Sequence, residues 1–220
     1  MGASLESHQV EEWSPYPDPW PRSQPIGSTV SYPLGAILLR QGQPVRSVFL
    51  IDRGVVKMIR TEANGRQLIT AFRSPGWLLG AAAVILGGNC ELTAQCATES
   101  EVRAIPAADF QRIHASEPSV AAWLHRMLAR DVREQATRLG VFLLEPAPRL
   151  KWLLGKLARD AAMDRNRLGH RRVFPIRQHD IAAAIGTSRE TVSRLLGDLE
   201  EAGEIERTRG WIRLTRAPGP

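Results

Sequence analysis

The chemistry that is easiest to assign in this sequence belongs to four polar residues near its C-terminus: Arg189, Glu190, Ser193 and Arg194. An arginine can donate two hydrogen bonds to a guanine, and a glutamate can accept one from the amino group of a cytosine. Side chains in the first turns of a helix that enters the major groove are the ones that reach base edges. These residues are therefore candidates for reading DNA. The segment 187–190 is also a capping box, in which Glu190 would only bond a backbone amide, and this alternative stays open.

Residues 178–201 meet the spatial requirements of a helix-turn-helix that would position these side chains. A first helix would bury Ile181 and Ile185, with the small Ala182 where the helices approach and Gly186 at the turn. A second helix would begin at Thr187 or Ser188, since either can cap it. It would bury four apolar residues in helical register: Val192, Leu195, Leu196 and Leu199.

Two short apolar runs follow this motif, on either side of Arg209-Gly210. They predict a β-hairpin and therefore a winged variant of the helix-turn-helix. The hairpin tip, with Arg209, could approach the phosphate backbone of DNA.

The distribution of charge also points to the C-terminal part of the chain as the part that binds a partner. The protein has 220 residues and a net charge of +6, with 14 basic and 14 acidic side chains in residues 1–146 but 15 basic and 9 acidic ones in residues 147–220. Excess positive charge in one part indicates an anionic partner such as nucleic acid, although a solvated basic face gives the same composition. The apolar content of 43% excludes a disordered chain.

The segment from Gly27 to Ile105 predicts a small antiparallel β domain. Short β-branched or aliphatic runs alternate with glycines there, and Asn64-Gly65 is a typical hairpin turn. The expected strands cover residues 36–39, 48–51, 55–59, 67–72, 93–97 and 102–105.

Residues 118–142 predict one long helix with a seam for a second copy of the chain. Apolar residues recur there at intervals of seven and four, with polar interruptions, which favours a two-helix dimer contact over a long independent coiled coil. A helix packed on its own domain is the alternative. The predicted seam consists of Ala121, Leu124, His125, Leu128, Val132, Gln135, Leu139 and Phe142. Glu145-Pro146-Ala147-Pro148 is then expected to stop the helix and act as a hinge, and a helix over 149–163 follows it.

These patterns predict an α+β protein in four parts. An extended proline-rich arm covers residues 1–25, a β-roll 26–115, the dimerisation helix and hinge 116–145, and a winged helix-turn-helix 146–220. The longest lipophilic run, 77–86, is too short to span a bilayer, so a cytoplasmic protein without a membrane partner is expected. Cys90 and Cys96 are too few for a disulfide scaffold or a cysteine-ligated cluster.

The glycine-punctuated β domain, the long helix and the run 188–196 (SRETVSRLL) together resemble the Crp/Fnr superfamily of transcription regulators. The resemblance covers about residues 26–215. It implies a homodimer on two-fold double-stranded DNA sites with half-sites similar to TGTGA, base contacts from Arg189, Glu190 and Arg194, and contact with RNA polymerase. Ser193 is also found in the Fnr-like branch. The resemblance further implies phosphate contacts from Gln178, His179 and Ser188, and Arg177 is expected to contact phosphate as well.

The family's cyclic-nucleotide site is where this sequence departs from the pattern. Members that bind cyclic AMP have a glutamate after the glycine matching Gly80 and an arginine about ten residues later. The carboxylate accepts from the ribose hydroxyl and the guanidinium neutralises the phosphate. Here Ala81-Ala82-Ala83 follows Gly80, so the glutamate is missing. The region expected to hold the arginine, 89–93, reads NCELT and contains none. Of the two polar residues by which the family's long helix contacts adenine, only Gln135 is present. No cyclic AMP response is expected.

No cofactor is predicted, but three alternatives stay open. Haem could be ligated by His8, His114, His125, Cys90 or Cys96, although their spacing is not diagnostic. Cys90 and Cys96 could form a thiol switch, or the β domain could take a small apolar ligand or no ligand at all. A cysteine-dependent enzyme using Cys96 with His114 is the alternative from another class, but no orienting group accompanies them. The sequence does not distinguish an activator from a repressor.

Overall fold

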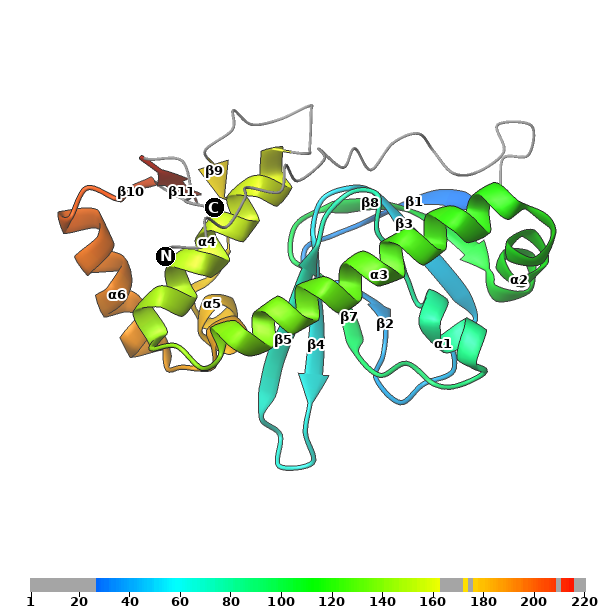
Figure 1. Cartoon of the computed structure of the whole chain (residues 1–220), viewed down its shortest axis with the longest axis horizontal. Helices are drawn as coiled ribbons and strands as arrows, with labels where there is room; N and C mark the ends of the chain where they lie inside the picture. The colour runs from blue at the N-terminus through cyan, green and yellow to red at the C-terminus, as the bar shows by residue number, and fades with distance from the viewer. Residues whose placement is uncertain (1–26, 163–171, 174–175, 209–210, 216–220) are drawn as a thin grey trace, which may run out of the picture.

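A computed structural model describes residues 27–162, 172–173, 176–208 and 211–215 of the chain. The predicted arm over residues 1–25 lies outside the described residues, as does Arg209. Figure 1 shows a β-rich body, a long helix along its side and a group of smaller helices at one end.

The β-rich body consists of two four-stranded antiparallel sheets, in the orders β1-β8-β3-β6 and β2-β7-β4-β5. All six predicted strands are present, and the structure adds β1, β6 and a short helix that their weak patterns did not reveal. The strands are β1 (Ser28–Tyr32), β2 (Ile37–Leu39), β3 (Ser47–Arg53), β4 (Val56–Thr61), β5 (Gln67–Arg73), β6 (Leu78–Leu79), β7 (Thr93–Cys96) and β8 (Ser100–Pro106).

The turn between β3 and β4 depends on Gly54. Its φ is +87°, and a β-carbon there would lie 2.4 Å from the carbonyl oxygen of Glu99. Any larger residue would therefore push apart the two segments that meet at this point.

Four helices follow or interrupt the strands: α1 (Ala81–Leu86), α2 (Ala107–Ser116), α3 (Pro118–Val141) and α4 (Pro146–Ala162). The long helix has nearly the predicted limits. The hinge prediction was wrong in position, because the break falls at residues 142–145, and Pro146 and Pro148 lie within the first turn of α4. Amides in a helix's first turn have no partner within the helix, so proline is tolerated there.

The C-terminal part contains α5 (Gln178–Ile185), α6 (Arg189–Glu201) and a three-stranded sheet in the order β10-β11-β9. Its strands are β9 (Arg172–Val173), β10 (Ile205–Thr208) and β11 (Trp211–Leu214), and the predicted hairpin of β10 and β11 is present.

Two hydrophobic cores hold these elements together, and the second extends beyond the C-terminal helices. The first joins the strands to α2 and the first half of α3. The second joins α4, α5 and α6 to four residues from the loop before β4 and from β4 and β5: Val55, Ile59, Ile69 and Phe72. The β4–β5 hairpin thus contributes buried residues to both cores. Figure 1 shows α5 beside β5.

Candidate nucleic-acid interface and the pocket beside the long helix

The helix-turn-helix has the predicted geometry. Ile181 and Ile185 of α5 and the four predicted apolar residues of α6 are buried together. Gly186 turns the chain with φ +67°, and a β-carbon there would lie 3.0 Å from the ring of Phe142. This glycine fixes the angle at which α6 leaves α5.

The outer face of α6 carries the side chains predicted to read bases: Arg189, Glu190, Ser193 and Arg194 are all exposed. In Figure 1, α6 lies at the end of the molecule farthest from the β-rich body. Arg194 forms an exposed ion pair with Asp198 at 3.3 Å. Such pairs contribute little, so this arginine can exchange its partner for a base at small cost.

Ser188 caps α6, because its hydroxyl accepts a hydrogen bond from the Thr191 amide at 3.1 Å. Glu190 is then the second residue of the helix and not the third, so the capping box that starts at Thr187 does not form. Hydrogen bonds from its own amide and from the Ser188 hydroxyl hold the pKa of the Glu190 carboxyl below its usual value. Glu190 therefore presents an ionised acceptor to solvent.

The predicted phosphate contacts on α5 lie at a second surface. Arg177, Gln178 and His179 line a cleft of about 810 Å³ between the C-terminal helices and the β-roll. Arg207 and Trp211 of the wing line the same cleft. Ser188, by contrast, lies exposed at the start of α6.

One ion pair across this cleft was not visible in the sequence. Lys57 of β4 donates to Asp180 of α5 at 2.6 Å, and both side chains are nearly buried. His179 lies 3.2 Å from the same carboxylate. Because 123 positions separate Lys57 from Asp180, no local pattern indicates this contact.

Replacing Lys57 by methionine is expected to lower the free energy of unfolding by about 3 kcal/mol, since it leaves the Asp180 carboxylate without its lysine in a nearly buried site. Urea denaturation of the purified variant measures the loss. Lys151→Met is the matched control, because Lys151 pairs with Glu204 on the surface and should cost less than about 1 kcal/mol. Equal losses would show that the Lys57 pair is no stronger than a surface pair.

A second contact fixes α5 to the long helix. The Arg138 guanidinium donates to the carbonyl oxygen of Ile69 in β5 and, at 2.6 Å, to that of Ala184 in α5. Arg149 of α4 donates to the Ile185 carbonyl at 3.0 Å. Both guanidiniums lie over the Phe142 ring, 5.1 and 5.3 Å from its centre. The last carbonyls of α5 are thus capped by two cations, where the helix dipole favours positive charge.

One residue of the predicted dimer seam is buried inside its own domain. Leu124 is fully buried in its own domain's core, so its assignment to the seam was wrong. The spacing of apolar residues in the sequence does not distinguish this buried leucine from the exposed residues near it. Val132 and Leu139 are 70% and 72% exposed, and His125 is exposed as well. Ala121, Leu128, Gln135 and Phe142 are half-buried. Leu143, which the prediction omitted, lies in the turn after α3 and is 88% exposed.

A pocket of about 280 Å³ lies between α3 and the β-roll, at the position expected for a nucleotide site. Ala81, Ala82, Ala83 and Glu91 line it, as does Gln135. Ala136, which aligns with the second residue of the family's adenine-contacting pair, is exposed and does not line the pocket. The Glu91 side chain extends to Arg60 at 3.1 Å and is largely exposed.

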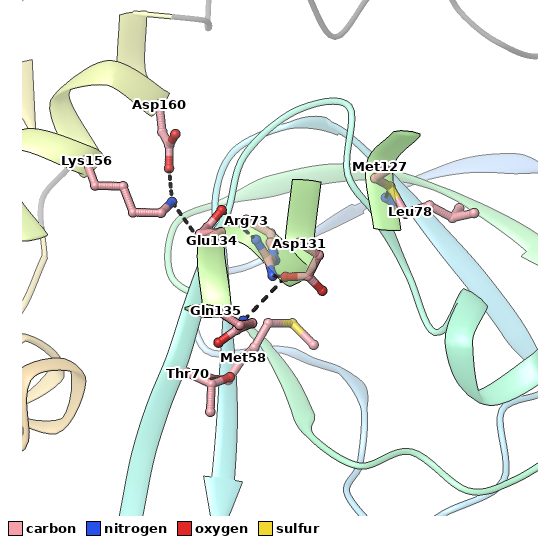
Figure 2. Close-up of polar contacts among 10 residues, drawn as sticks. All are labelled: Met58, Thr70, Arg73, Leu78, Met127, Asp131, Glu134, Gln135, Lys156 and Asp160. Carbon is pink, nitrogen blue, oxygen red and sulfur yellow. Dashed lines mark hydrogen bonds and ion pairs between the residues drawn. The ribbon is translucent and has the colours of Figure 1, made fainter. Parts of the chain in front are cut away.

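The cation in the wall of this pocket is Arg73, which sequence reasoning missed. Figure 2 shows its guanidinium between Asp131 and Glu134 of α3. It pairs with Asp131 and, at 3.2 Å, with Glu134, and it stacks 3.8 Å from the centre of the Trp77 ring. From sequence alone, an arginine at the end of a strand is expected to be exposed to solvent. The Arg73 side chain is instead only 5% exposed.

The residues considered for redox, haem or enzyme chemistry are dispersed. Burial raises the pKa of both thiols, Cys90 beside the α3 pocket and Cys96 beside the interdomain cleft, which makes them poor nucleophiles. His114 stacks on Phe110 and lies edge-on to His125, and His8 lies outside the described residues. Within the described ranges, no group of three or more His, Cys, Asp or Glu side chains is arranged to hold a metal ion.

Of the helices that the structure describes, none has the length and apolarity that a bilayer crossing requires.

Comparisons with known proteins agree with this architecture. A cyclic nucleotide-binding domain model matches residues 29–117, and a Crp-like helix-turn-helix domain model matches residues 148–219. The Cyclic AMP receptor protein of Thermus thermophilus is 33% identical over 187 residues, which cover 84% of this chain and 83% of the relative. A CRP-like cAMP-activated global transcriptional regulator of Mycobacterium tuberculosis is 28% identical and covers 84% and 80%.

A solved structure supports the same fold. FixK2 from Bradyrhizobium japonicum superimposes with a TM-score of 0.75 at 22% identity, covering 87% of this chain and 94% of that one. The relatives are transcription regulators and not enzymes, which removes the cysteine-dependent enzyme from consideration. With both domain models matched and a relative of this similarity over most of its length, the chain belongs to the Crp/Fnr family of DNA-binding transcription regulators.

Proposed function

We propose that the protein is a sequence-specific regulator that acts in the cytoplasm as a homodimer on two-fold DNA sites with half-sites similar to TGTGA, and that cyclic AMP does not control it. The observation that carries the proposal is the exposed face of α6, where two arginines and an ionised glutamate stand together. These groups match guanine and cytosine edges in the major groove. RNA polymerase is the further partner that we propose, as the family resemblance implies.

The dimer is supported by the apolar face of α3. Val132 and Leu139 are exposed and lie seven residues apart, which places them on the same side of the helix, and the exposed Leu143 follows in the turn after α3. Two chains joined along this side would present two copies of α6 to successive major grooves, about 34 Å apart.

Independence from cyclic AMP is supported by the pocket. Ala81 offers no carboxylate for a ribose hydroxyl, and Arg73 is already paired with Asp131 and Glu134. A cyclic phosphate in this pocket would lack a free cation and would meet two carboxylates, which is unfavourable in a buried site. The names of two relatives describe them as a receptor for cyclic AMP and as activated by it. This chain, by contrast, does not respond to cyclic AMP.

The test of base reading compares two arginines. Arg194→Ala is expected to cost about 1 to 3 kcal/mol on a palindromic TGTGA-type duplex and to relax the preference at one base position. Arg177→Ala should weaken binding to matched and scrambled duplexes by the same factor, because phosphates carry no sequence information. Fluorescence anisotropy at one fixed salt concentration, with and without cyclic AMP, measures both.

Two outcomes would contradict the proposal. Equal losses for Arg194→Ala on matched and scrambled DNA would remove the base-reading role of α6. Binding that requires cyclic AMP would show that the pocket holds the phosphate through other groups.

A further inference from the structure

The pocket between α3 and the β-roll has the dimensions of a small-molecule site. Its volume of about 280 Å³ is just below the usual range for such sites, roughly 300 to 1,000 Å³. Apolar side chains form most of its wall, including Leu39, Leu78 and Leu86. Met58 and Met127 add flexible thioethers, which adapt to ligands of different shape (Figure 2).

The charged groups that line the pocket are paired with other groups of the protein. Among the residues that line it, Arg73 is the one cation, and it is already paired with two carboxylates and stacked on the Trp77 ring. Glu91 points to Arg60 and solvent. A buried charge is stable only when it is paired, so neither an anionic nor a cationic ligand would find an unpaired partner here. Gln135, whose amide nitrogen donates to Asp131 at 3.3 Å, supplies a neutral hydrogen-bonding group at the edge.

The same arginine connects the pocket to the DNA-binding domain. Glu134 accepts from Arg73 through one carboxylate oxygen and pairs with Lys156 of α4 through the other, each at 3.2 Å. Lys156 also binds Asp160, one turn further along α4, at 2.5 Å (Figure 2). Burial opposes the ionisation of Glu134, but Lys156 and Arg73 outweigh it and hold the pKa of this carboxyl below its usual value. Glu134 is therefore an ionised bridge between the pocket wall and α4.

We propose that this pocket binds an uncharged, largely apolar small molecule, and that Glu134 transmits its occupancy from Arg73 to α4. The proposal deepens the function proposed above, because it names the class of effector for a DNA-binding regulator that does not respond to cyclic AMP. A ligand that displaces Arg73 or Asp131 changes the partners of Glu134, and through Lys156 it changes how α4 is held against α3.

A matched pair of fluorescent probes tests the ligand class. N-phenyl-1-naphthylamine is neutral, and 1-anilinonaphthalene-8-sulfonate has nearly the same rings with one negative charge. The full-length protein without DNA should bind the neutral probe saturably at one site per chain and the sulfonate at least about tenfold more weakly. Millimolar cyclic AMP should not displace the neutral probe. Equal affinity for both probes, or displacement by cyclic AMP, would overturn the proposal.

Two substitutions on α1 locate the probe. Ala83→Phe places a ring in the pocket and should abolish binding of the neutral probe, whereas Ile85→Phe, on the same helix but outside the pocket, should leave it unchanged. Circular dichroism checks that both variants fold. Loss in both variants, or in neither, would mean that the probe binds elsewhere.

Hydrogen exchange tests the transmission step. Binding of the neutral probe should change the exchange rates of amides in α4, and Glu134→Gln should remove this change while probe affinity stays within about twofold. Probe binding that leaves α4 unchanged in the unsubstituted protein would overturn transmission through Glu134. None of these measurements uses DNA, so a failure to bind operator would count against the proposed function and not against this pocket.

Discussion

Leu139→Glu is expected to convert the dimer into monomers and to lower affinity for a two-fold operator by about 100-fold or more. Leu139 is exposed near the C-terminal end of α3, on the same side of the helix as the exposed Val132. In a two-fold seam each glutamate would face apolar side chains and lie near its copy, so the seam would have to bury two like charges. Light scattering gives the oligomeric state, and anisotropy on the palindromic duplex gives the affinity.

Thr137→Glu is the control for this prediction. It introduces the same charge two residues away, on an exposed part of α3 that faces in a different direction. It should leave both the dimer and operator binding intact. A dimeric Leu139→Glu protein would show that the subunits meet through another surface.

Arg138→Met is expected to lower the free energy of unfolding by about 3 kcal/mol. The Arg138 side chain is nearly buried and provides the donor for the carbonyls of Ile69 and Ala184. Burial lowers its pKa to about 10, so it remains a cation at neutral pH. Methionine keeps the length of the side chain but leaves both carbonyls without this donor. Denaturant titration followed by circular dichroism measures the loss.

Arg133→Met serves as the matched control, because Arg133 lies on the same helix and is exposed. The change at 133 should alter stability by no more than about 0.5 kcal/mol. If Arg138→Met were equally mild, the two carbonyls would have to find other donors, and the contact would not hold α5 against β5.

The helix-turn-helix could be predicted from the sequence because its determinants are local. Gly186 is the residue that tolerates the positive φ of the turn, Ser188 is a strong cap, and the apolar residues of both helices follow the helical period. The same applies to the strands of the β-roll with regular patterns. β1, the two-residue β6 and the six-residue α1 are too short or too polar to produce such a pattern.

The polar contacts between the domains could not be predicted in this way. Lys57, Arg73 and Arg138 are charged residues in elements with mixed patterns, and a sequence pattern places such residues in solvent. Their burial depends on carboxylates and carbonyls that lie 46 to 123 positions away along the chain. Leu124 shows the reverse error: heptad spacing alone does not tell whether an apolar residue faces its own domain or a partner.

The sharing of β4 and β5 between the two cores has a consequence for how such regulators can be recombined. The hinge at residues 142–145 divides the polypeptide, but the second core continues across it through Ile59, Ile69 and Phe72. A chimaera that joins this β-roll to the C-terminal helices of another regulator at the hinge would place those helices against strand residues that fit α4, α5 and α6 of this protein. Sensor and DNA-binding halves of this protein are therefore exchangeable only together with the outer surface of the β4–β5 hairpin, so the unit of exchange is discontinuous in sequence.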